Sequence, residues 1–287
     1  MSEGGYEKRT KRMQNLDYAW LEIVNAEVKV GEARFALFDF DGTLSVIRQG
    51  WEKVMIDVML ESICAGKAPS PEIEAEVADY VDRSTGILTI KQMKWLEAAA
   101  KRHGIAQELR TASEYKRLYL DRLLQPVYAR LEELDGSQAA RERWMVAGAS
   151  DFLSHLYEHG VQLFLASGTD QEYVFKEAEA LGIAHFFQGR IYGAQGDSEE
   201  DSKERVIRRI LVEHSLSGNE LLVVGDGPVE IQAARQAGAI TLGVACQEAD
   251  RTSPEVHKRQ RLLGAGADLI VSNFLHSHEL VEILCSG

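Results

Sequence analysis

Two aspartates separated by one residue follow a short apolar run near the N-terminus. Residues 35–38 read Phe-Ala-Leu-Phe, which is compatible with a strand buried on both faces, and Asp39, Asp41 and Gly42 come next. Bringing two carboxylates together raises the energy of both, whereas a cation would remove that cost, and oxygen ligands suit a hard cation such as Mg²⁺. Gly42 allows the backbone to turn sharply and to approach a ligand closely. A plain Asp-Gly turn is the alternative, but the whole run Phe-Asp-Phe-Asp-Gly-Thr-Leu favours a cation site.

A second apolar run, residues 161–166, ends in Ser167-Gly168-Thr169. A strand that stops at a hydroxyl and a glycine brings an O–H group and backbone N–H groups to one point, which suits a phosphoryl oxygen. An ordinary helix start capped by Ser167 or Thr169 accounts for the same residues. Taken alone, this stretch favours the helix cap, and only its place as the second such strand end shifts the interpretation towards a phosphoryl site.

Lys203 lies in the first turn of a predicted helix that follows the acidic segment 196–202. A lysine there opposes the helix dipole, so the position is unfavourable unless the lysine faces an anion. A solvated surface lysine is the alternative. Arg205 is the second candidate for an anion-binding cation in this turn.

A third apolar run, residues 221–224, ends in Gly225-Asp226-Gly227, and Glu230 follows four residues after Asp226. Glu230 is therefore expected on the first turn of the next helix. Alone, the stretch favours a plain turn between a strand and a helix. A functional interpretation is favoured only because this stretch is another strand end that carries an acid.

In this order, the four stretches resemble the motifs of the haloacid dehalogenase (HAD) superfamily of phosphotransferases. Residues 38–44 resemble the first motif, and Ser167, Lys203 and Asp226 correspond to the second, third and fourth. The branch that the chain resembles is that of phosphoglycolate phosphatase and β-phosphoglucomutase.

The resemblance implies a role for each of these residues. Asp39 would be the nucleophile, with one oxygen on Mg²⁺ and the other attacking phosphorus to form an aspartyl-phosphate. Asp41 would protonate the leaving oxygen and then deprotonate the hydrolytic water, and its main-chain carbonyl would also reach the metal. Glu230, where the family often has Asp, would lie behind the metal ligands, and direct contact with the metal is left open. The implied metal ligands are Asp39, Asp41 and Asp226, and the implied phosphate-binding residues are Gly42, Ser167, Gly168 and Lys203.

Asp41 also separates the reactions of the family. Halide displacement needs no general acid for a leaving alcohol, and the dehalogenases of the family lack an aspartate at this position. The phosphonate-cleaving members also lack it. Its presence therefore implies phosphate-ester hydrolysis or mutase chemistry.

Apolar runs alternate with helical patterns, which predicts an α/β fold with a parallel sheet, a Rossmann-like three-layer core. The expected strands are residues 35–38, 161–166, 221–224, 240–245 and 267–271, with a further short strand within 186–192. Residues 21–24 are compatible with an edge strand or with part of a short helix. Ligands of such sheets bind beyond the carboxyl ends of the strands, where all four motifs lie.

About a hundred residues of helical pattern follow the first motif, and they resemble a C1-type cap that closes over the site. The pattern predicts a helix start at Ser70, a helix over 89–103 and a helix over 106–134 that is broken or kinked at Pro126. Within this stretch residues 83–86 are a candidate substrate-reading loop, whereas Arg48 and Trp51 are expected to pack at the hinge. The predicted domains are an N-terminal extension (1–30), the core (31–48 and 138–287) and the helical cap (49–137).

Composition limits the partners. The 287 residues carry a net charge of −13 with a pI of about 5.2, which argues against nucleic acid or an anionic membrane as a partner. Three widely separated cysteines favour a reducing cytoplasm, and the polar N-terminus shows no signal core. We therefore expect a cytoplasmic enzyme, with its oligomeric state open.

These observations predict a phosphoric monoester hydrolase: a Mg²⁺-dependent phosphatase acting on a small phosphorylated metabolite. A phosphomutase of the β-phosphoglucomutase type is the alternative enzyme. A catalytically silent HAD fold that only binds a ligand is an alternative of another class. The presence of the reactive residue types in all four motifs argues against the silent form.

Overall fold

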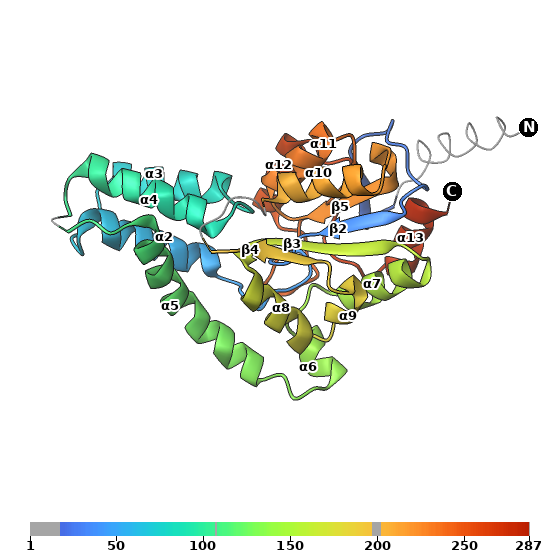
Figure 1. Cartoon of the computed structure of the whole chain (residues 1–287), viewed down its shortest axis with the longest axis horizontal. Coiled ribbons are helices and arrows are strands. Elements are labelled where there is room, and N and C mark those ends of the chain that lie inside the picture. The colour runs from blue at the N-terminus through green and yellow to red at the C-terminus, as the bar shows by residue number, and fades with distance from the viewer. Residues whose placement is uncertain (1–17, 107, 197–201, 287) are drawn as a thin grey trace, which may run out of the picture.

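The computed structural model describes residues 18–106, 108–196 and 202–286, which form a seven-stranded sheet flanked by helices (Figure 1). The strand order is β1-β7-β6-β5-β2-β3-β4, and every pair is parallel except β1 with β7. The strands are β1 (Leu21–Ile23), β2 (Phe35–Phe38), β3 (Gln162–Asp170), β4 (Ile191–Ala194), β5 (Leu221–Gly225), β6 (Ile240–Val244) and β7 (Leu269–Val271). The predicted α/β class with a parallel sheet is confirmed.

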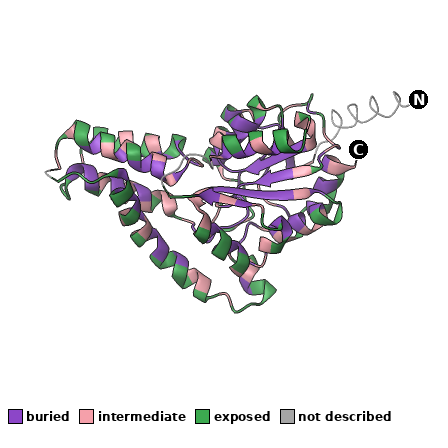
Figure 2. Cartoon of the chain, in the orientation of Figure 1, coloured by how far each residue is buried: buried purple, intermediate pink, exposed green. Residues whose placement is uncertain are grey.

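The register of the central strands determines where the site lies. β2 lies between β3 and β5, and Phe38 is level with both Leu165 and Val224. The residues that follow these strands therefore meet at one edge of the sheet. Figure 2 shows the central strands buried along their length, which agrees with their nearly continuous apolar sequences.

Helices cover both faces of the sheet. Alternate residues of β2 point to opposite sides, and all of them are apolar, so both faces need a covering layer. Leu37 packs with buried residues of α10 and α11, whereas Ala36 and Phe38 belong to the large cluster that includes α7, α8 and α13. The core helices are α7 (Ala149–Glu158), α8 (Gln171–Ala180), α9 (Ala184–Phe187), α10 (Lys203–Glu213), α11 (Pro228–Gln236), α12 (Val256–Ala265) and α13 (Ser277–Cys285), with the 3₁₀ turn η1 (Gly218–Glu220).

A helical insert, α2 to α5, interrupts the chain between β2 and β3 and extends away from one end of the sheet (Figure 1). The insert consists of α2 (Trp51–Cys64), α3 (Pro71–Arg83), α4 (Thr89–His103) and α5 (Ala112–Glu132), and the short α6 (Gln138–Glu142) leads back to the core. Ser70 caps α3 by accepting from the Ile73 amide, and Thr111 begins α5 in a capping box with Glu114. Among the described helices none is both long and apolar enough to cross a membrane.

The structure corrects two sequence-based boundaries and decides between the two alternatives for residues 21–24. β3 continues to Asp170, because its pairing with β4 resumes at Asp170–Ala194 after an irregularity that follows Ala166. α5 runs through Pro126 as one helix, which packs against α2 and α4. Residues 21–23 form the edge strand of the two alternatives. The first part of the predicted N-terminal extension, residues 1–17, lies outside the described residues, and the domain boundaries stay predictions.

Candidate active site

Asp39, directly after β2, lies among charged groups from α10 and α11. Its amide donates to the Val224 carbonyl (2.9 Å), which fixes its backbone against β5. Lys203 Nζ lies 2.8 Å from Asp39 Oδ1 and 3.0 Å from Glu230 Oε2. All three side chains are buried, so Lys203 is a paired cation at the start of α10 and the surface alternative is wrong.

Carboxylate oxygens of Asp39, Asp226 and Glu230 all lie within 4.8 Å of one another. An oxygen-only donor set of this size fits a hard divalent cation. Glu230, expected behind the metal ligands, lies close enough to the two aspartates to share a cation with them, and its Oε1 accepts from the Gly227 amide (2.7 Å) at the start of α11. Three of the four motifs are thus brought to one place by the ends of β2 and β5 and the starts of α10 and α11.

The site contains a second buried lysine, which pairs with Asp226 and which the sequence did not indicate. Lys258 of α12 places Nζ 2.7 Å from Asp226 Oδ2 and 2.7 Å from Glu248 Oε1. The pKa of Lys258 is raised, because Asp226 and Glu248 outweigh the burial that alone would lower it. No motif spacing links Lys258 to Asp226, so sequence reasoning had no signal for this pair.

Asp41 lies between a hydroxyl pair and a buried ion pair. Ser167 Oγ and Thr169 Oγ1 donate to Asp41 Oδ2 (3.5 and 3.3 Å). The other oxygen, Oδ1, is buried with no hydrogen-bond partner in the part of the chain that the structure describes, and it lies 3.7 Å from Arg48 Nε. Arg48 in turn donates to Glu177 of α8 through Nε (3.0 Å) and Nη2 (2.6 Å). The expectation that Arg48 only packs is therefore wrong, because it is a buried charge beside Asp41.

Burial dominates the electrostatics of the two aspartates. Desolvation raises the pKa of Asp39 well above its usual range, and Lys203 opposes the shift only in part. Desolvation likewise raises the pKa of Asp41 to about 7, with Arg48 as the main opposing charge. The pKa of Lys203 is raised, because Asp39 and Glu230 outweigh the effect of burial. A bound cation would stabilise the charged form of the acids.

Gly42 is required for close packing, and its backbone N–H group is not free to donate a hydrogen bond to phosphate. Its φ is +75°, and a Cβ there would collide with Asp226 Oδ2 and lie 3.0 Å from Lys258 Nζ. Its amide already donates to the Ser45 carbonyl (2.8 Å). The phosphate-binding assignment of the Gly42 amide is therefore corrected to a steric role.

The core and the helical insert together enclose a cavity of about 60 Å³. Of the predicted substrate-reading loop, Thr85 and Gly86 line this cavity, whereas Arg83 is exposed and pairs with Asp79. The core contributes Asp39, Asp41, Arg48, Ser167, Gly168, Thr169, Lys203 and Asp226, and the insert contributes Trp51, Thr85, Gly86, Ile87, Thr89, Gln92, Tyr119 and Leu123.

Comparison with known proteins identifies the family. The model of the haloacid dehalogenase-like hydrolases matches residues 34–238. The chain belongs to this family. The predicted family is thereby confirmed, and with it the prediction of a hydrolase.

Relatives of this haloacid dehalogenase-like hydrolase include curated phosphoglycolate phosphatases. That of Vibrio cholerae is 24% identical over 209 residues, which cover 72% of this chain and 82% of the relative. That of Aliivibrio fischeri is 26% identical over 125 residues, 42% of this chain and 55% of the relative.

Solved structures share the fold of this hydrolase. A predicted phosphatase from Clostridium acetobutylicum has a TM-score of 0.56 at 17% identity, with 87% of this chain and 98% of that chain covered. A putative β-phosphoglucomutase from Bacteroides vulgatus has a TM-score of 0.57 at 17% identity, with 98% and 97% covered.

Proposed function

We propose that this hydrolase is a Mg²⁺-dependent phosphatase that cleaves a small phosphate monoester through an aspartyl-phosphate. The observation that carries the proposal is the buried contact of Asp39 with Lys203, next to the carboxylates of Asp226 and Glu230. A carboxylate beside a fixed ammonium and a cation-sized acidic cluster can approach a dianionic phosphoryl group that it would otherwise repel. Asp39, Asp226 and Glu230 would hold the ion, together with the main-chain carbonyl of Asp41, and the ion would supply positive charge at the phosphoryl oxygens.

The residues divide the reaction between them. Asp39 attacks phosphorus with one carboxylate oxygen, and the bond from phosphorus to the ester oxygen breaks. Asp41, with its raised pKa, gives a proton to the departing oxygen and later takes one from the water that attacks the aspartyl-phosphate. Ser167 and Lys203 balance the charge that spreads over the phosphoryl oxygens.

Cavity size supports a small substrate. A volume of about 60 Å³ corresponds to only a few water positions, at roughly 10–15 Å³ each, and this supports a phosphoryl group with a short leaving group as the ligand. Because the curated relatives are phosphoglycolate phosphatases, 2-phosphoglycolate is the first candidate.

A panel of phosphorylated metabolites tests the proposal, with released phosphate measured with and without Mg²⁺. We expect Mg²⁺-dependent release, highest for two- to three-carbon esters, and the Asp39→Asn variant serves as the blank. Conversion of a sugar 1-phosphate into its 6-phosphate without free phosphate would instead identify a mutase. No release from any ester would overturn the proposal and favour a binding module.

A further inference from the structure

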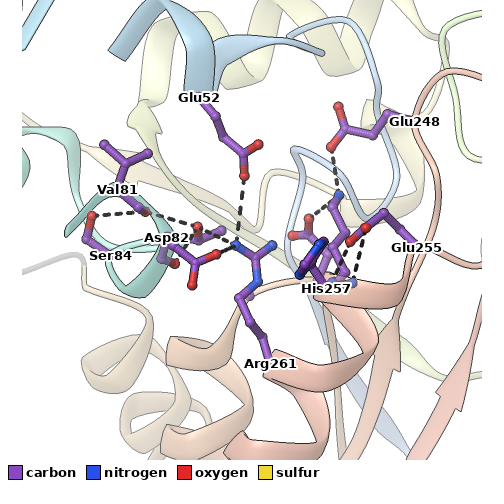
Figure 3. Close-up of polar contacts among 12 residues, drawn as sticks. Glu52, Val81, Asp82, Ser84, Glu248, Glu255, His257 and Arg261 are labelled. Carbon is purple, nitrogen blue, oxygen red and sulfur yellow. Dashed lines mark hydrogen bonds and ion pairs between the residues drawn. The ribbon is translucent and has the colours of Figure 1, made fainter. Parts of the chain in front are cut away.

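Arg261 of α12 joins the core to the helical insert outside the reacting groups (Figure 3). Its Nη1 lies 2.7 Å from Asp82 Oδ1, at the end of α3, and 3.3 Å from Thr85 Oγ1. The same nitrogen lies 3.9 Å from Glu52 Oε1 of α2. The Arg261 side chain is 13% exposed and that of Asp82 is 59% exposed, so solvent reaches this ion pair mainly from the side of Asp82.

The segment that Arg261 holds, residues 84–87, lies directly on the phosphate side of the cavity. A Cβ on Gly86 would come within 2.7 Å of Glu230 Oε2 and 3.3 Å of Lys203 Nζ, so the backbone there contacts the catalytic cluster. A Cβ on Gly168 would collide with the Ile87 carbonyl. Small displacements of this segment would therefore open the cavity exactly where the phosphoryl group is proposed to bind.

Thr85 links the ion pair to the segment. Its hydroxyl donates to the Asp82 carbonyl (3.0 Å) and can accept from Arg261 Nη1. Arg261 thus contacts both Asp82, in the last turn of α3, and Thr85, within the lining segment. One guanidinium fixes both.

α12 is a firm base for this contact. Leu262 is fully buried against β6. Arg259 on the same helix pairs with Glu22 of β1 (2.6 Å), but both side chains are well exposed, so this pair adds little to the anchoring of the helix. Lys258, one turn before Arg261, contacts Asp226. The helix that supports a proposed metal ligand therefore also reaches the insert.

We propose that Arg261 is a positioning residue that clamps residues 84–87 onto the phosphate site when the insert closes. Its effect on turnover rests on the proposed phosphatase function, whereas its effect on the segment does not. If a bound ester is enclosed by a favourable closing step, weakening that step raises KM before it lowers kcat.

The test compares Arg261→Gln with Arg259→Gln, a matched control that removes an arginine–glutamate ion pair from the same helix but away from the insert. We expect Arg261→Gln to raise the KM for an aryl phosphate about five- to tenfold, with kcat within about twofold. Amide hydrogen exchange in residues 84–87 should speed up by a similar factor. Arg259→Gln should change neither quantity.

Charge reversal separates positioning from general damage. Arg261→Asp combined with Asp82→Arg should recover much of the exchange protection and of the KM, whereas each single reversal should not. Unchanged exchange in residues 84–87 of Arg261→Gln would overturn the clamp, as would equal effects of Arg259→Gln. Faster exchange in a chain that hydrolyses no ester would support the clamp and count against the phosphatase.

Discussion

The two walls of the cavity differ in charge. The wall that the core builds carries Asp39, Asp41, Arg48, Lys203 and Asp226, whereas the residues that line it from the helical insert are all uncharged. The charged wall is held by ion pairs of 2.6–3.0 Å, and the neutral wall by helix packing together with the contact of Arg261 with Asp82 and Thr85.

This difference separates two tasks. A phosphoryl group is the same in every ester, so the wall that meets it can be built from fixed charges. The leaving group varies between substrates, and the part of the neutral wall beyond residues 84–87 would select it through shape. Changes in the core wall should therefore alter the chemistry for every ester, whereas changes in the insert should alter the choice among esters.

The largest effect is expected from Asp39→Asn. An amide oxygen is a poor nucleophile, so kcat should fall by roughly 10³-fold or more for every ester. Because burial already opposes the charged form of Asp39, the neutral amide should leave the fold intact, which circular dichroism and thermal unfolding check. Residual turnover near that of the unaltered chain would show that another group attacks phosphorus.

Removal of the metal should affect every ester in the same way. Chelation by EDTA should lower activity by roughly 10²-fold or more, and added Mg²⁺ should restore it. Asp226→Asn should raise the Mg²⁺ concentration needed for half-maximal activity. Mg²⁺ should also increase the free energy of unfolding of the unaltered chain, by about 2.7 kcal/mol at a hundred times its Kd. Its melting temperature should rise accordingly. A melting temperature indifferent to Mg²⁺ would contradict a built cation site.

Asp41 should show its role through the leaving group and the pH. Its pKa of about 7 leaves it protonated below neutral pH, so its ability to protonate a departing alkoxide is lost as the pH rises through 7. We expect kcat/KM for an alkyl phosphate to fall about tenfold per pH unit above that point. An aryl phosphate, whose leaving group needs no proton, should fall much less. Asp41→Asn should abolish this difference, and parallel pH profiles for the two esters would argue against Asp41 as the acid.

The aspartates of the charged wall could be predicted from sequence, since they follow strand ends. Asp39, Ser167 and Asp226 each follow an apolar run, and parallel strands in register bring such ends together. Lys203 was a candidate because a cation at a helix start is unfavourable without an anion, and its correspondence to the third motif favoured it over a surface lysine. Assignment of their chemical roles still depends on the proposed reaction.

Other parts of the site had no local signal. Lys258 is 32 residues from Asp226, and Glu177 is 129 residues from Arg48, so each pair exists only through the packing of helices. Of the candidate substrate-reading loop, residues 83–86, only Thr85 and Gly86 line the cavity, and its role in reading the substrate stays a prediction. Which helical residues face a cavity follows from helix orientation, and a helical pattern alone leaves that orientation open.

The smallest effect is expected from Leu123→Ala on the neutral wall. Leu123 of α5 is buried and lines the cavity, so its truncation should enlarge the space for the leaving group. The ratio of kcat/KM for a bulkier ester to that for a shorter one should rise by about fivefold. The Mg²⁺ requirement and the pH profile should not change.

Leu124 provides the matched control, because it is the next residue of α5 and is buried without lining the cavity. Each Leu→Ala change should lower the free energy of unfolding by about 2–5 kcal/mol, which chemical denaturation measures. Only Leu123→Ala should shift the preference among esters, since Leu123 lines the cavity and Leu124 does not. A shift in Mg²⁺ affinity in Leu123→Ala, or an equal change of preference in Leu124→Ala, would show that the two walls do not act separately.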